Sequence, residues 1–294
     1  MTTSDTDPFA RPDSRFNVLD GWTWIGCYGG YYLQADLLTN HGFEHGFFTR
    51  RWHGRGPDEL SGYVSAGVSV HRPQQIHSGI VLNASEATAA PWPEADGLVS
   101  DRGGQSLWVC GADCTPVLIA DPVSGHTAAC HAGWRGVAAR ILPEAVRLLE
   151  QRGAQRDALL VALGPAVSGD RYQVGQDVID AVINSLLVGS PSRDGTLRIS
   201  PNASPIDRDA HETALRDNGA VRPDEQPNKF RLDIRHATVQ QLLREGLSQE
   251  HIAHCPLCTV GEPELFHSWR RDQVKAVQWS GIVSQAPTPF QANI

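Results

Sequence analysis

The spacing of apolar residues along the chain changes between two periods, one typical of strands and one typical of helices. Alternating or short apolar runs predict strands over 62–70, 76–82, 107–110 and 159–163. Helical spacing predicts three longer helices, which are 137 to about 152 with Gly153 as its stop, 176–187, and 232–245 with Gly246 as its stop. Because strands and helices are interleaved without a regular strand–helix–strand repeat, the pattern predicts an α+β fold.

A β-hairpin is predicted near the middle of the chain. The apolar residues 115–120 and 127–130 flank a turn-forming segment, Asp121-Pro122-Val123-Ser124-Gly125. A hairpin symmetric about Pro122 and Val123 places Cys114 directly opposite His131. Their Cβ atoms are then about 4.5–5.5 Å apart, while strand alternation turns Asp113 and Cys130 to the opposite face.

The rest of the chain predicts one domain with two irregular segments. Residues 1–20 are polar and rich in proline, so we expect a disordered N-terminal segment. Residues 21–294 then form a single catalytic domain. Within it, residues 188–228 are dominated by turn formers and predict a long surface loop or lid.

Composition narrows the class of protein. Charged residues make up 20% of the chain and the formal net charge is -8, which argues against nucleic-acid binding as the main function. No signal or transit peptide and no membrane span is evident, so we expect no membrane partner. The six cysteines then predict free thiols or metal ligands in a reducing, cytoplasmic setting.

Three short segments carry the residues that favour metal chemistry: Gln75-Ile76-His77-Ser78, Ala112-Asp113-Cys114-Thr115-Pro116, and His131 to Gly136. Histidine and cysteine are the commonest zinc ligands. Three protein ligands leave a fourth position for water or substrate. We therefore predict a catalytic zinc site at His77, Cys114 and His131.

These segments, together with GPAVSGDRYQVG (164–175) and FHSWRRD (266–272), resemble the multicopper polyphenol oxidase or laccase-domain family. The resemblance runs from about His45 to Ile282. Members are also described as purine nucleoside phosphorylases and peptidoglycan-editing factors. The resemblance implies a mixed α/β sandwich, shared with the catalytic domain of a cytotoxic necrotising toxin. It also implies metal ligation by the three residues that match the family's ligands: His77, Cys114 and His131.

The same resemblance implies a small-molecule reaction. Its expected substrates are purine nucleosides, with phosphorolysis of adenosine, inosine or S-methyl-5'-thioadenosine, and deamination of adenosine. Zinc is the expected cofactor, with copper possible. A polyphenol oxidase activity fits less well, because the chain has no His-x-His pair. A second reading makes Cys114 a nucleophile and His131 its base in a hydrolase or editing enzyme that acts on peptidoglycan precursors. A third is a metal-storage or redox-sensing protein.

Five polar residues are expected to bind substrate or to orient the metal ligands. Arg135, Arg50 and Arg271 are candidates for holding phosphate, with Arg270 beside Arg271 in the same motif. Gln75 and Ser78 flank His77 and are expected to orient it or to contact substrate.

Three further features give weaker evidence of a functional role. Asp96 is interpreted as a turn cap. Tyr172 is expected to pack the following helix. The segment from His251 to Cys258 offers two histidines and two cysteines. Four ligands packed so tightly rarely complete one tetrahedral site, so Cys255 and Cys258 are interpreted as buried thiols.

Overall fold

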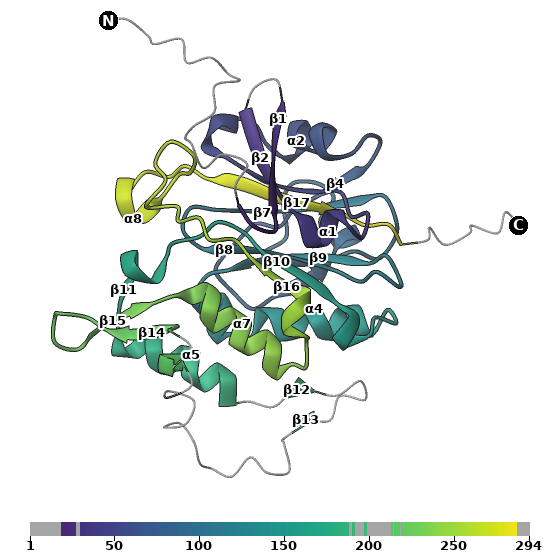
Figure 1. Cartoon of the computed structure of the whole chain (residues 1–294). Helices are drawn as coiled ribbons and strands as arrows, with labels where there is room; N and C mark the ends of the chain where they lie inside the picture. The colour runs from purple at the N-terminus through teal and green to yellow at the C-terminus, as the bar shows by residue number, and fades with distance from the viewer. Residues whose placement is uncertain are drawn as a thin grey trace, which may run out of the picture.

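A computed structural model describes residues 19–27, 30–187, 190–191, 197–198, 213, 215–217 and 219–286. Two β-sheets pack face to face, and helices cover the outer faces (Figure 1). The predicted α+β class and mixed α/β sandwich are confirmed. None of the helices within these residues has the length and hydropathy needed to cross a membrane.

The first sheet joins the two ends of the described chain. Its strands, in spatial order, are β1 (Trp22–Cys27), β2 (Gly30–Ala35), β3 (His45–Phe48), β17 (Gln278–Val283), β7 (Gln105–Gly111) and β4 (Ser69–His71). Helix α2 (Pro57–Val64) packs on the outer face, where Leu60 contacts Tyr32, Phe48 and Trp108.

The second sheet carries the predicted hairpin at its centre. Its strands, in spatial order, are β16 (Ile252–His254), β10 (Leu160–Leu163), β8 (Thr115–Ala120), β9 (Thr127–Ala132), β6 (Gly97–Val99) and β5 (Val81–Asn83). Every residue of β8 and β9 is buried. Both faces of this sheet are covered, which explains why these strands are apolar throughout.

Strand alternation divides the core into two layers. Leu118 and Ala129 face the first sheet, whereas Val117 and Ile119 face the helices. The long helices on that side are α4 (Ile141–Glu150), α5 (Gln176–Leu187) and α7 (Ile234–Arg244). His131 lies in β9, Cys114 directly before β8, and His77 in the loop before β5.

Shorter elements complete the chain. The remaining strands are β11 (Gln173–Gly175), β15 (Lys229–Leu232) and β14 (Val221–Pro223) in a small sheet, and the pair β12 (Ser190–Pro191) and β13 (Leu197–Arg198). The remaining helices are α1 (Asp36–Thr39), α3 (Trp134–Ala138), α8 (Trp269–Asp272), and the 3-10 turns η1 (Arg50–Trp52), η2 (Ala84–Glu86), η3 (Arg156–Ala158), η4 (Gly169–Arg171) and η5 (Gln249–His251).

Several element predictions are confirmed. The strands over 107–110 and 159–163 are found as β7 and β10, the helix over 176–187 is α5, and α7 lies within 232–245. The strand predicted over 62–70 is wrong, because α2 continues to Val64 and only Ser69–His71 is a strand. The strand over 76–82 is also wrong over most of its length, because β5 begins at Val81.

The single helix predicted after Gly136 is two helices. Arg140, with a φ of 62°, separates α3 from α4. Its guanidinium donates to Ser185 O at 2.6 Å and to Glu245 at 2.8 Å, contacts that hold the break in place. The period of apolar residues continues across the break, so the pattern alone predicts one helix.

The hairpin forms with a different register from the predicted one. Pro116, not Cys114, pairs with His131, and Ala120 pairs with Thr127. The prediction is wrong because the turn is longer: Asp121 N donates to His126 O at 2.9 Å. The shift of two residues leaves each side chain on its predicted face. Cys114 and His131 are therefore diagonal neighbours on one face, rather than directly opposed residues.

The two segments expected to be irregular are only partly described. Residues 1–18 lie outside the described residues, as do most of 188–218. Within the predicted loop, the structure places the short strands β12, β13 and β14.

Candidate metal centre

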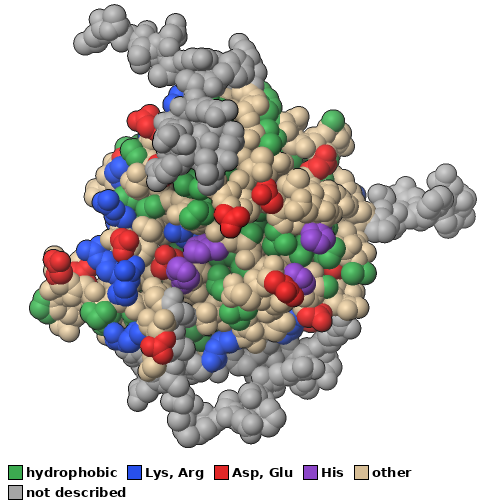
Figure 2. Space-filling model, viewed as in Figure 1, with side chains coloured by type: hydrophobic (Ala, Val, Ile, Leu, Met, Phe, Trp, Pro, Cys, Tyr) green, Lys and Arg blue, Asp and Glu red, His purple; other side chains and the backbone are tan. Residues whose placement is uncertain are grey.

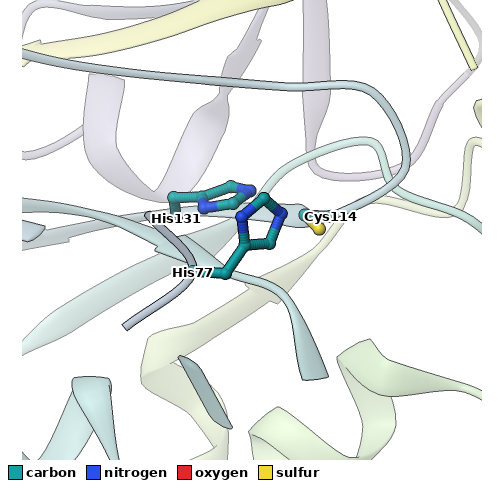
Figure 3. Close-up of side chains that lie close together, drawn as sticks. All are labelled: His77, Cys114 and His131. Atoms are coloured by element: carbon teal, nitrogen blue, oxygen red, sulfur yellow. The ribbon is translucent and has the colours of Figure 1, made fainter. Parts of the chain in front are cut away.

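His77, Cys114 and His131 lie together, although they come from a loop, a strand entrance and a strand end (Figure 3). One ligand atom from each lies within 4.8 Å of the other two. The two imidazole rings have centroids 4.9 Å apart and cross at 81°, so they face a shared point from different directions. This is the only group of three or more potential ligands so placed within the described ranges.

The Asp96 carboxylate organises both histidines. It is fully buried and accepts a 2.9 Å hydrogen bond from Nδ1 of His131. It also accepts from the backbone N–H groups of Ile76, His77 and Ser78 at 3.2, 3.0 and 2.5 Å. A carboxylate behind a ligating histidine fixes the ring and the nitrogen left for the metal. Here the same carboxylate also fixes the loop that carries the second histidine.

One candidate ligand and the residue before another have unusual backbone conformations. His77 has a φ of 61°, and Asp113, directly before Cys114, has a φ of 98°. Such conformations are disfavoured for non-glycine residues and persist only where surrounding contacts enforce them. Around Asp113 those contacts are hydrogen bonds from Thr259 Oγ1 and Arg270 N, each 2.6 Å long. As predicted, Asp113 points away from the other ligands.

Gly133 makes room for the Cys114 sulfur. A Cβ atom at Gly133 would lie 2.7 Å from Cys114 Sγ, closer than real Cβ contacts allow. Any larger residue therefore displaces the thiol from the position that the two histidines share.

The three ligands perturb one another electrostatically. Burial alone raises the pKa of the Cys114 thiol, but hydrogen bonding to His131 and His77 lowers it to about 6. Burial alone lowers the pKa of His131, but Asp96 and Cys114 raise it to about 9. Cys114 therefore exists as a thiolate at neutral pH, the form that binds metal and that acts as a nucleophile.

Gln75 and Ser78 support the His77 loop from two sides. The Gln75 amide donates to Cys110 O and accepts from Cys110 N, both at 2.7 Å, so it attaches the loop to the end of β7. The Ser78 hydroxyl donates to Asp96 at 2.8 Å. Sequence reasoning treats Asp96 as a turn cap, which it is. Its bond to His131 is missed, because no sequence spacing connects the two.

The three candidate arginines differ sharply in their contacts. Arg271 donates to the carbonyl groups of Thr259 and Phe266 and to both oxygens of Asp272. Arg50 donates to Pro263 O at 2.6 Å. Arg135 is exposed, and its guanidinium lies 4.3 Å from the ring centroid of Trp134.

A narrow cleft opens beside Cys114. Its walls are mostly apolar, and Gln278 and Ser280 add polar groups. The other lining residues are Phe47, Phe48, Gly111, Pro116, Pro165 and Phe266. His77, Cys114 and His131 are therefore bordered by a narrow cleft lined by both polar and apolar residues.

The cysteines of the His251–Cys258 segment lie apart from this cluster. Cys255 is fully buried in the core between the sheets. Cys258 Sγ accepts from the backbone N–H groups of Ser168 and Gly261 at 3.3 and 3.4 Å. Neither cysteine forms a disulfide. The prediction of a buried thiol is confirmed for Cys255 and wrong for Cys258, which is half-buried.

The sequence matches the family model described as multi-copper polyphenol oxidoreductase laccase over residues 61–194 and 196–284. It is 38% identical over 277 residues to purine nucleoside phosphorylase slr1573 of Synechocystis sp., covering 90% of this chain and 98% of that protein. It is 31% identical over 183 residues to purine nucleoside phosphorylase YlmD of Bacillus subtilis, covering 61% of this chain and 55% of that protein.

Solved structures show the same fold. The structure of YlmD from Geobacillus stearothermophilus aligns with a TM-score of 0.68 at 23% identity, covering 86% of this chain and 96% of that one. Neisseria meningitidis protein NMB0706 aligns with a TM-score of 0.64 at 27% identity, covering 82% and 94%. With a family model matched over most of its length, this chain belongs to the multi-copper polyphenol oxidoreductase laccase family.

Proposed function

We propose that this protein is a zinc-dependent purine nucleoside phosphorylase. The observation that carries the proposal is the group of His77, Cys114 and His131, with one ligand atom of each within 4.8 Å of the others. The relative that matches 90% of the chain is named a purine nucleoside phosphorylase. Inosine, adenosine and S-methyl-5'-thioadenosine are the proposed substrates, and deamination of adenosine is a proposed second activity.

The residues present fit a zinc ion. Two imidazoles and a thiolate match the donor preference of zinc, and three protein ligands leave one position open to a reactant. The lowered pKa of Cys114 and the Asp96 bond to His131 Nδ1 prepare both residues for ligation. When bound, zinc supplies a Lewis acid beside the nucleoside. The same donors also bind copper, so metal analysis has to decide between the two.

In phosphorolysis a phosphate oxygen bonds to C1' of the ribose as the bond from C1' to the purine nitrogen breaks. The base leaves with the electron pair and takes up a proton. The chain contributes position: Gln278 and Ser280 line the narrow cleft beside Cys114 and offer polar groups to the base. Arginine side chains at the mouth attract phosphate. This arrangement accounts for binding of both reactants next to the ligand cluster.

Metal analysis combined with a nucleoside screen tests the proposal. The purified protein is expected to hold about one zinc per chain and to release free base and ribose 1-phosphate from inosine or adenosine only when phosphate is present. Cys114→Ala is expected to lose both the zinc and the turnover. Full zinc retention in Cys114→Ala contradicts the metal site, and turnover no higher than in a metal-free control contradicts the activity.

A Cys/His hydrolase acting on peptidoglycan precursors is a second candidate. The specific observation in its favour is the Cys114 thiolate beside His131, a pair that supports acyl transfer in other folds. A thiolate bound to zinc is not free to attack. Stoichiometric zinc that protects Cys114 from alkylation therefore favours the phosphorylase, and rapid alkylation with hydrolysis of peptidoglycan peptides favours the hydrolase.

A further inference from the structure

The FHSWRRD segment presents two adjacent arginines whose surroundings differ. Arg271 is engaged by backbone carbonyl groups and Asp272 through all three of its nitrogens. Its role is to hold the C-terminal segment in place. Among the described residues, the Arg270 side chain donates one hydrogen bond, from Nη1 to Gln173 O at 3.2 Å. The remaining donors of its guanidinium are available to a ligand.

Arg270 is attached directly to the metal-site framework. Its backbone N–H donates to Asp113, the residue before Cys114, at 2.6 Å. Its guanidinium carbon lies 4.8 Å from the ring centroid of Tyr172. An arginine stacked on an aromatic ring is held in one orientation, with its edge donors directed outward.

Arg135 is attached to the same framework at a second point, near Cys114. It follows Gly133, which abuts the Cys114 sulfur, and its guanidinium lies 4.3 Å from the Trp134 ring centroid. Across the part of the chain that the structure describes, no hydrogen bond or carboxylate partner is found for this guanidinium. Arg135 is thus a second stacked arginine with free donors.

Tyr172 lies within electrostatic reach of both arginines and of Cys114. Burial and the Cys114 thiolate raise the pKa of Tyr172 to about 12, whereas Arg270 and Arg135 act in the opposite direction. Its hydroxyl therefore stays protonated at neutral pH and can donate a hydrogen bond. Two cations facing one phenol form a place where an anion relieves charge repulsion.

The surrounding surface is also basic. Figure 2 shows Lys and Arg side chains gathered at the left of the view, over α8 and the small sheet of β11, β15 and β14, despite the net charge of -8. Arg222, Lys229 and Arg231 belong to that sheet. Such a local field draws anions toward the mouth of the site.

We infer that Arg135 and Arg270, with the Tyr172 hydroxyl, hold the inorganic phosphate co-substrate. This inference rests on the proposed phosphorolysis and assigns its anion site to Arg270 rather than to Arg271 or Arg50. Arginine matches tetrahedral phosphate with paired N–H donors. The phosphate binds both stacked guanidinium groups, that of Arg270, whose backbone bonds to Asp113, and that of Arg135, two residues after Gly133.

Steady-state kinetics of Arg270→Gln and Arg135→Gln test the assignment. With inosine saturating, each variant is expected to raise the KM for phosphate about 10- to 100-fold, about 1.4 to 2.8 kcal/mol of lost binding. The KM for inosine and the zinc content are expected to stay near the wild-type values. Arg270→Lys keeps the charge but lacks the paired N–H donors of a guanidinium. It is expected to have a phosphate KM between those of the wild type and Arg270→Gln. Arg222→Gln is the matched control, because Arg222 is exposed on the same basic face and pairs with Asp170 at 2.8 Å.

The outcomes separate the inference from the function on which it rests. Wild-type turnover that needs phosphate, together with an unchanged phosphate KM in Arg270→Gln and Arg135→Gln, overturns the inference alone. A rise in the phosphate KM of these two variants no larger than that in Arg222→Gln also overturns the inference, because the effect is then due to the loss of any positive charge on this face. Wild-type protein with no phosphate-dependent turnover overturns the proposed function.

Discussion

Replacing Asp96 with asparagine tests the idea that one carboxylate holds both histidines. Oδ1 accepts from His131 Nδ1 and His77 N, and Oδ2 accepts from Ile76 N, Ser78 N and Ser78 Oγ. An asparagine presents one oxygen and one NH2 group. In either orientation of the asparagine amide, its NH2 group therefore faces at least two hydrogen-bond donors.

The size of the effect follows from burial. Asp96 is 0% exposed, so water cannot replace the lost partners. Each hydrogen bond to a charged group contributes about 1.5–3 kcal/mol, so losing two lowers the free energy of unfolding by about 3–6 kcal/mol. Loss of a carboxylate behind a ligating histidine weakens metal binding by about 10- to 100-fold.

Urea unfolding and zinc competition with a chelator measure the two effects. Ser78→Ala keeps the carboxylate and removes the hydroxyl that donates to Asp96 at 2.8 Å and accepts from Ile80 N at 3.2 Å, so it is expected to give a smaller loss of about 1–2 kcal/mol and to stay folded. Asp157→Asn, at an exposed site, is the matched control for the charge change. Zinc affinity and stability in Asp96→Asn equal to those of Asp157→Asn would refute the reasoning.

Three further substitutions test other contacts. Gly133→Ala is expected to weaken zinc binding at least about tenfold by displacing the ligand sulfur, whereas Gly62→Ala, with open space around it, keeps wild-type zinc affinity in the same competition assay. Asp233→Ala removes the N-cap of α7 and is expected to cost about 1–2 kcal/mol in urea unfolding near pH 7. Burial alone raises the pKa of Asp233, but hydrogen bonds and positive charge at the start of α7 lower it overall. The difference in free energy of unfolding between the wild type and Asp233→Ala is therefore largest above the unfolded pKa of about 3.9. It shrinks as the pH falls toward the folded pKa, so an equal difference at pH 7 and pH 3 contradicts this. Cys255→Ser with Cys258→Ser is expected to leave zinc stoichiometry unchanged and to cost about 1–3 kcal/mol; a fall in bound zinc shows that these thiols ligate metal.

The sequence predicts that His77, Cys114 and His131 lie together, but it does not predict the geometry that joins them. Side-chain alternation places Cys114 and His131 on one face of the hairpin, and that conclusion survives a register wrong by two residues. The register depends on hydrogen bonds inside the turn, such as Asp121 N to His126 O, which composition does not reveal.

Contacts between distant segments are the part that local patterns leave out. Asp96 and His131 are 35 positions apart and adjacent in space. The Asp113 carboxylate binds the backbone of Arg270, 157 positions away. In both cases one polar side chain stabilises a loop whose own sequence resembles an ordinary turn. Apolar periodicity locates β7, β8 and α5, but it carries no information about such polar partners.

The central place of β17 has a consequence for the order in which the protein folds during synthesis. This strand, Gln278–Val283, lies between β3 and β7, so these two strands do not pair with each other. Until the ribosome has released residues near 283, the first sheet is divided into two halves with unpaired edges. Such edges are sites of aggregation. The protein therefore depends on rapid late insertion of its last strand, and chaperones that shield exposed strand edges are expected to increase its yield.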